Sequence, residues 1–163
     1  MIAIISDAVV IPKEAQVRLT AKSEYGVLAA IDLACHYGSG PVSAREIAER
    51  RGIPPRFLEQ IFVSLRRADL VVAVRGAKGG FTLSRLPQEI TVLDIVEALE
   101  GPLASSLCDQ SRDEGCGKSA TCAAAPVWAR ATRALRDVFA STTLASLGGT
   151  QDTFDRRESA VGN

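Results

Sequence analysis

The sequence has little or none of several features that mark common protein classes. Among its 163 residues it has one histidine, no Cys-x2-Cys pair and no apolar stretch long enough to span a bilayer. With no visible base–nucleophile pair or cofactor loop, an enzyme is the weakest interpretation. The absence of Cys-x2-Cys knuckles puts structural zinc second among the metal sites to consider. The absence of a membrane span favours a cytoplasmic protein that makes no membrane contact.

The first sixteen residues lack the basic start of a signal peptide. They are apolar, are interrupted by Asp7 and are too short to cross a bilayer. We therefore treat residues 1–16 as an N-terminal extension that is disordered or mis-started, and we expect the working protein to begin near Val17.

The chain also lacks a net charge, but its charges are unevenly distributed. Residues 17–85 carry 11 basic against 6 acidic residues, whereas residues 86–163 carry 7 against 11. A basic N-terminal half is suited to DNA, because contacts to phosphates use Lys and Arg. Charge alone leaves open a solvated basic face with no nucleic-acid partner.

Capping residues predict a helix-turn-helix in this basic half. Apolar spacing indicates helices over 20–36, 43–51 and 56–68, and Ser43 with Glu46 forms a capping box at the start of the second. A glycine ends that short helix and a Pro-Pro pair begins the next. Two short helices joined by a tight turn are typical of a helix-turn-helix, whose second helix is the candidate recognition helix.

A small β-wing is predicted after this helix. β-Branched and aromatic runs over 70–74 and 81–83 flank a Gly-rich turn. Further helices are expected over 92–100 and 126–140, with a last helical turn at 143–147. The fold class is therefore mainly α with a small β-wing, a winged helix-turn-helix plus a long dimerisation helix. The apolar residues of that long helix have the spacing of a dimer seam: Val127, Trp128, Leu135 and Val138.

The recognition helix carries residue types that read bases. Its outward residues near the N-terminus are Arg56, Glu59 and Gln60, and Gln pairs with adenine while Glu accepts from cytosine. The helix is expected to be seated on the domain by an apolar stripe of Phe57, Leu58, Ile61, Phe62 and Leu65.

The wing and the helix ends supply basic residues. Arg75 and Lys78 lie among three glycines, which let the backbone approach DNA closely and an arginine reach the minor groove. The predicted phosphate contacts, which set register rather than specificity, are Arg18, Lys22, Arg66 and Arg67. Winged helices also serve as protein-interaction modules, but the basic wing favours DNA.

Three cysteines, Cys108, Cys116 and Cys122, lie in one polar loop with the spacing Cys-x7-Cys-x5-Cys. In a reducing compartment such thiols are metal ligands or redox sensors more often than disulfides. A flexible loop can wrap three thiolates around an iron–sulfur cluster. Zinc and a metal-free thiol switch remain open alternatives. Cys35 and His36, at the end of the first helix, are interpreted as a buried small residue and a helix cap.

Residues 17–148 resemble the IscR/NsrR type of bacterial winged-helix regulator, the Rrf-two family. The likeness lies in the cysteine loop and in four segments, 17–26, 57–62, 65–71 and 74–81, with Val17 where the family has its initiator Met. The resemblance implies a homodimer that binds a palindromic operator, with a 2Fe-2S or 4Fe-4S cluster near the dimerisation helices. The resulting organisation is an extension over 1–16, a winged-helix DNA-binding domain over 17–85, a cluster-binding loop and dimerisation helix over 86–148, and a disordered tail over 149–163.

Two positions depart from the family pattern. Asp69 stands where the family usually has Gly, and Asp tolerates the left-handed conformation needed there. Ala125 stands where IscR-type members have a ligating His, so the fourth ligand must come from elsewhere. Glu24 lies where NsrR-like members place an acidic ligand from the partner subunit, and the resemblance suggests Glu24 as the fourth ligand. From its residue type alone, Glu24 fits nearly as well an exposed helix carboxylate that forms an i,i−2 or i,i+4 surface contact.

The sequence therefore predicts a DNA-binding transcriptional regulator, a repressor, that senses iron–sulfur status, redox state or nitric oxide. The alternative within the family is a cluster-free regulator that responds to thiol oxidation or to a metabolite.

Overall fold

The computed structural model describes residues 20–103 and 122–161, and of residues 153–161 only the backbone. Cys108 and Cys116, Arg18 and the predicted extension over 1–16 lie outside these ranges. In chain order the elements are α1 (Ala21–Cys35), α2 (Ala44–Arg51), α3 (Pro55–Arg67), β1 (Val71–Val74), β2 (Gly80–Leu83), the 3-10 helix η1 (Pro87–Glu89), α4 (Val92–Glu100), α5 (Ala125–Ser141) and α6 (Leu144–Val161). The predicted fold, mainly helical with an antiparallel two-stranded wing, is confirmed.

The helices begin where side-chain oxygens satisfy their first backbone N–H groups. The Thr20 hydroxyl accepts from the Ser23 N–H at 3.4 Å and starts α1. At α2 the predicted capping box is present: the Ser43 N–H donates to Glu46 at 2.9 Å and the Glu46 N–H donates to Ser43 Oγ at 3.2 Å. The Ser43 hydroxyl also holds the pKa of the Glu46 carboxyl below its usual value. These starts are local features, which is why the sequence located them.

Helix α3 is seated on the core by one face, as predicted. Leu58, Ile61, Phe62 and Leu65 are at most 1% exposed, and the Phe62 ring stacks on Phe81 of β2 with centroids 4.0 Å apart. Phe57 was expected in this stripe, but it is 40% exposed. Its ring meets the Tyr25 ring of α1 edge to face instead, at 5.8 Å, while its neighbour Leu58 supplies the buried side of the first turn of α3.

The predicted disordered tail over 149–163 is corrected by α6, which continues to Val161. Leu144 is fully buried, and the Gly148 backbone lies against Ala34 and Cys35 of α1. The Leu144 N–H also donates to the Ile90 carbonyl at 2.9 Å. This docking starts the helix, and extending a helix costs far less than nucleating one, so the glycines do not end it.

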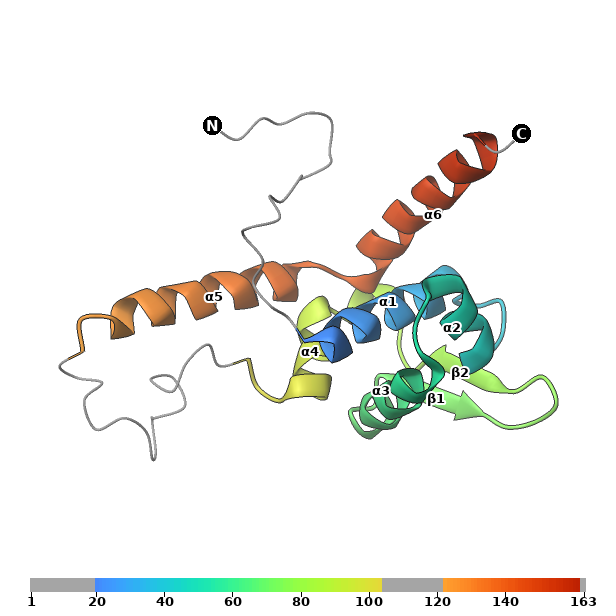
Figure 1. Cartoon of the computed structure of the whole chain (residues 1–163), viewed down its shortest axis with the longest axis horizontal. Helices are drawn as coiled ribbons and strands as arrows, with labels where there is room; N and C mark the ends of the chain where they lie inside the picture. Colours follow the sequence, from blue (N-terminus) through green and yellow to red (C-terminus); the bar gives the residue numbers. More distant parts are fainter. Residues whose placement is uncertain (1–19, 104–121, 162–163) are drawn as a thin grey trace.

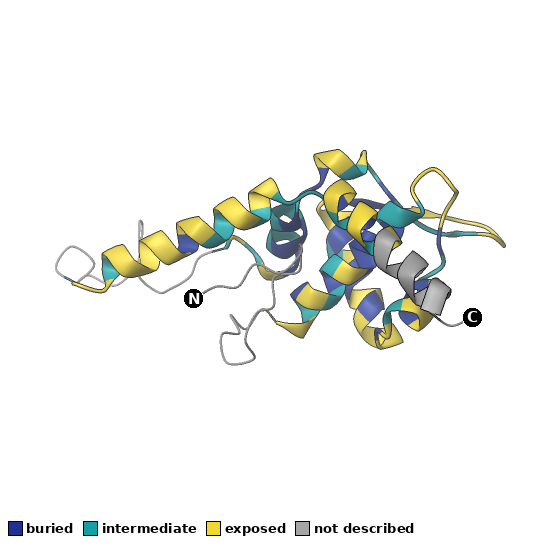
Figure 2. Cartoon of the chain, turned by 90° about the horizontal axis from the view of Figure 1, so that it is seen from above, coloured by how far each residue is buried: buried dark blue, intermediate teal, exposed yellow. Residues whose placement is uncertain are grey.

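Helix α5 differs from the helices of the body in its exposure. Helix α5 extends away from the body on the side opposite the wing (Figure 1). Its surface is mostly exposed, whereas most of the buried residues lie in the body, on α1 to α4 and the two strands (Figure 2). On α5, Val127 is 62% and Val138 59% exposed. Exposed apolar side chains on an extended helix support the predicted dimer seam, which stays a prediction.

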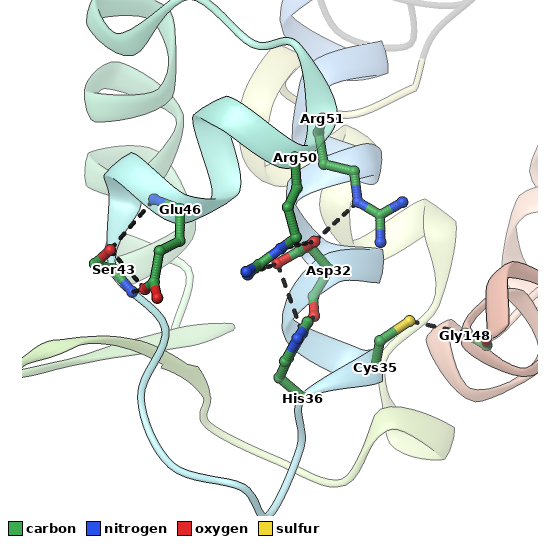
Figure 3. A network of polar contacts seen from close by, with 8 residues as sticks. All are labelled: Asp32, Cys35, His36, Ser43, Glu46, Arg50, Arg51 and Gly148. Atoms are coloured by element: carbon green, nitrogen blue, oxygen red, sulfur yellow. Dashed lines mark hydrogen bonds and ion pairs between the residues drawn. The ribbon is translucent and has the colours of Figure 1, made fainter. Parts of the chain in front are cut away.

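A buried carboxylate that the sequence reading missed joins α1 to α2. Asp32 is fully buried, and its oxygens accept from Arg50 Nε at 3.1 Å, Arg50 Nη2 at 2.8 Å and Arg51 Nε at 2.9 Å (Figure 3). The Asp32 carboxylate keeps the pKa of Arg50 above its ordinary value. His36 caps α1, with its Nδ1 2.7 Å from the Asp32 carbonyl, which confirms its interpretation as a cap. The network holds α2 in place behind the recognition helix.

Candidate nucleic-acid interface and sensor segment

The helix-turn-helix is formed by α2 and α3. The turn between them contains Gly52 in the left-handed conformation, with φ of 62°, and the Ile53 N–H donates back to Ala48. The predicted base-reading residues of α3, Arg56, Glu59 and Gln60, are all exposed. Their exposure, combined with the buried opposite face of α3, leaves the residues predicted to enter the major groove free to do so.

The wing is a tight hairpin beside α3. Strand β1 pairs antiparallel with β2 in the register Val71–Leu83 to Val74–Gly80. A further bridge joins β2 to the segment before α2, where Val42 and Phe81 exchange hydrogen bonds of 2.9 and 2.8 Å. The exposed Arg75 lies in the turn, as predicted.

The glycines of the wing have a different role from the expected one. A Cβ on Gly80 would lie 2.3 Å from the Val42 carbonyl oxygen, and one on Gly79 would lie 2.4 Å from the Val74 carbonyl oxygen. These two glycines are therefore required by contacts within the protein. Only Gly76, with φ of 126° and open space around it, has the freedom that an approach to DNA would use.

The remaining basic residues fall into two groups. Arg66, Arg67 and Lys78 are exposed and free to contact phosphates. Lys22 is half-buried, and its Nζ donates to the Leu99 carbonyl of α4 at 2.7 Å. A phosphate contact by Lys22 would have to break that hydrogen bond, so its predicted role is weakened by the structure.

The turn after α3 confirms one prediction drawn from the sequence. Asp69 has φ of 55° and is the one non-glycine residue with positive φ among residues 20–103 and 122–161. Asp accepts this conformation at lower cost than most residues. Its carbonyl also accepts from Ser84 Oγ at 2.5 Å, which ties the turn to the end of β2.

Of the predicted cluster ligands, the structure describes Cys122 and Glu24. Cys122 is half-buried, and its carbonyl accepts from the Ala125 N–H at 3.1 Å, directly at the start of α5. Glu24 is exposed on the first turn of α1, and within the described residues its carboxylate forms no hydrogen bond or ion pair. The alternative of a paired surface carboxylate is therefore not seen there. Residues 20–103 and 122–161 by themselves hold no group of three metal-ligating side chains, since two of the cysteines lie outside them.

Cys35 has the properties of a structural thiol. It is half-buried, and its Sγ donates to the Gly148 carbonyl at 3.8 Å (Figure 3). Burial, reinforced by the nearby Asp152 carboxylate, raises the pKa of the Cys35 thiol to about 11. Because the thiolate is the reactive form, Cys35 is a poor nucleophile and a poor redox sensor at neutral pH.

Two acidic residues of α4 were also missed. Glu97 accepts from the Leu103 N–H at 3.0 Å and binds Arg136 of α5, and Glu100 accepts from Ser23 Oγ of α1 at 2.7 Å. No sequence spacing links partners so far apart in the chain. For Asp32 there was a signal, a lone carboxylate inside the apolar run 29–33, where a buried and paired charge is the expected explanation.

Comparison with known proteins gives a consistent assignment. The model of a family described as "Rrf2: Iron-dependent Transcriptional regulator" matches residues 19–149. The HTH-type transcriptional regulator IscR of Sodalis glossinidius is 36% identical over 138 residues, which are 85% of this chain and 82% of that protein.

Solved structures agree with the sequence match. The structure of CymR, the global cysteine regulator of B. subtilis, has a TM-score of 0.68 and 32% identity, covering 83% of this chain and 98% of that one. The T. potens IscR structure has a TM-score of 0.66 and 36% identity, covering 86% of this chain and 90% of that one. Within the described residues, no helix is both long and apolar enough to cross a membrane.

Proposed function

The chain belongs to the Rrf2 family of winged-helix, DNA-binding transcriptional regulators, and from this premise we propose that it is a homodimeric repressor that senses through an iron–sulfur cluster. The family is one of regulators rather than of enzymes, as the sequence predicted. The observation that carries the sensing half is the cysteine triad, whose last member, Cys122, leads directly into α5.

The donor set fits a cluster with one non-cysteine ligand. Thiolates of Cys108, Cys116 and Cys122 would hold three positions, and Ala125, where IscR-type members have a His, has no donor atom. The Glu24 carboxylate, which has no partner among residues 20–103 and 122–161, supports its assignment as the fourth ligand, supplied by the partner subunit. When bound, the cluster would tie the cysteine loop in place. Loss, oxidation or nitrosylation of the cluster would change how that loop is held.

DNA binding uses the two halves of the dimer together. The recognition helices would enter successive major grooves of a palindromic operator, with the wings beside them. Arg56, Glu59 and Gln60 read bases, and Arg75 approaches the minor groove. A coupling of roughly 1–3 kcal/mol between loop and DNA would change operator affinity about 5- to 150-fold.

A second candidate is a cluster-free regulator that responds to oxidation of its own thiols or to a metabolite. It is favoured by the similarity to CymR, which is described as a global cysteine regulator. Cys35 is unsuited to a thiol switch because its pKa is raised, so such a sensor would also use the loop cysteines.

Anaerobic purification separates the two candidates. We expect a coloured protein that contains iron and sulfide and binds its promoter fragment more weakly as salt is raised, because binding releases counterions from phosphates. A protein that stays iron-free after reconstitution, yet binds the promoter, would favour the cluster-free candidate. Binding that does not change with salt would contradict the proposed DNA interface.

Replacing Glu24 tests the fourth ligand. Glu24→Ala is expected to leave folding unchanged, because the side chain is exposed and unpaired in the described structure. Removing a ligand should speed cluster loss about tenfold or more. The measurement is the decay of cluster absorbance under a chelator, with Glu49→Ala as the control, an exposed α2 carboxylate paired only with Arg45. Equal decay rates in the two variants would show that Glu24 is not a ligand.

A further inference from the structure

The last turn of α4 carries two carboxylates that bind different parts of the protein. Glu97 and Glu100 are three residues apart and therefore lie on the same side of the helix. Glu97 binds the segments on either side of the cysteines, through the Leu103 N–H and through Arg136 of α5. Any displacement of these segments therefore acts on the last turn of α4.

Glu100 connects the same turn to the beginning of α1. Its Oε1 accepts from the hydroxyls of Thr20 and Ser23, and Ser23 is fully buried. The Thr20 hydrogen bond is the main reason that the pKa of the Glu100 carboxyl is lowered, so the group is ionised at neutral pH. Lys22 adds a hydrogen bond of 2.7 Å to the Leu99 carbonyl. Three polar contacts from the beginning of α1 and its N-cap residue thus hold the end of α4.

Helices α1 and α4 are also in direct apolar contact. A Cβ placed on Gly26 would lie 2.1 Å from Leu99 Cδ1, so the Leu99 side chain occupies the space that a Cβ at this position would need. Closely packed elements move together rather than deforming independently. With Glu100 fixing this contact, a shift of the last turn of α4 is transferred to the first two turns of α1.

The first turns of α1 lead to the recognition helix. Tyr25, next to the proposed ligand Glu24, contacts Phe57 with ring centroids 5.8 Å apart. Phe57 follows Arg56 at the base-reading end of α3. The exposed position of Phe57, which the core does not explain, is explained by this contact.

We propose that Glu100 is a positioning residue that transmits the state of the sensor segment, the chain between Leu103 and α5 that carries the three cysteines, to the DNA-reading end of α3, through the first turns of α1 and the Tyr25–Phe57 contact. This inference rests on the proposed function, and it names the residue through which that function is regulated. The coupling is measured as the change in operator affinity that the cluster causes.

The experiment compares operator affinity with and without the cluster in the full-length dimer. In the parent protein the ratio of the two Kd values is expected to lie between about 5 and 150. In Glu100→Ala the ratio is expected to fall to within about twofold of one, with iron content unchanged, because neither proposed ligands nor DNA contacts are altered. Glu89→Ala is the matched control, since this variant also removes a carboxylate. In the described structure the Glu89 carboxylate caps its own 3-10 helix, by accepting from the Leu86 N–H at 3.2 Å.

A second variant covers a loss of folding. Glu100→Gln keeps the shape and one hydrogen-bond acceptor, so it should fold and give an intermediate ratio. The proposal is overturned if the ratio of Kd values in Glu100→Ala equals the parent ratio. If the alanine variant does not fold, the same ratio in Glu100→Gln decides.

A readout without iron separates this proposal from the proposed function. By reciprocity, operator DNA must change the state of the sensor segment if that segment changes operator affinity. We would follow alkylation of Cys122 by mass spectrometry in the apo protein, with and without operator. An operator effect in the parent that disappears in the Glu100 variant supports the proposal even if the protein never holds iron. An effect present in both, or absent from both, overturns it.

Discussion

Replacing Asp32 by alanine is expected to lower the free energy of unfolding by about 3 to 5 kcal/mol. The carboxylate is fully buried and accepts hydrogen bonds from Arg50 and Arg51. Its removal leaves two guanidinium groups without their partner, and the Arg51 side chain is only 12% exposed, so water replaces the lost contacts poorly. The expected effect is a large part of the stability of an ordinary domain.

Urea or thermal unfolding followed by circular dichroism measures this loss. For a chain of this size the change corresponds to a Tm lowered by roughly 10 °C. Asp137→Ala is the control, because that aspartate is exposed on α5 and should unfold within about 0.5 kcal/mol of the parent. Arg50→Ala should cost less than Asp32→Ala, since Arg51 still pairs the carboxylate. An Asp32→Ala protein as stable as the control would mean that the ion pairs add nothing net to folding.

Replacing Cys122 by alanine is expected to abolish iron retention in the anaerobically isolated protein. Three thiolates and one weaker ligand hold the proposed cluster, and two thiolates are too few to keep it. The thiol is half-buried at the beginning of α5, so the substitution should change stability little. Iron content and visible absorbance should fall at least about tenfold.

The chain contains a matched control for this variant. Cys35→Ala removes the other thiol that the structure describes, one whose pKa of about 11 and contact with Gly148 mark it as structural. The control should keep iron and colour. Loss of iron from both variants would indicate a general effect of unfolding, and retention in Cys122→Ala would remove this cysteine from the ligand set.

Some positions were predictable because their physics is local. The starts of α1, α2 and α4 follow from capping hydroxyls, and α2 ends at Gly52 because a glycine adopts positive φ without strain. The apolar period of α3 likewise predicted which side is buried, apart from Phe57 in its first turn. The same apolar period predicted that the arginines of α3 are exposed.

Other features were not predictable because they depend on partners distant in the chain. Helix α6 exists beyond two glycines because Leu144 and Gly148 dock on the body. Gly80 is required by its close approach to Val42, and not by the approach to DNA that a glycine in the wing had suggested. No spacing indicated the pairing of Glu100 with Ser23, which are 77 residues apart.

By itself the sequence determined the helix starts, the winged helix-turn-helix, the exposed side of α3 and the spacing of the cysteine triad, since each depends on residue type and on neighbours within a few positions. Only the tertiary structure decided how the helices are joined: Asp32 joins α1 to α2, Glu97 joins α4 to α5, and Glu100 joins α4 to α1. The reason is that a buried or bridging carboxylate is stable only where the fold brings donors to it, and those donors come from other elements.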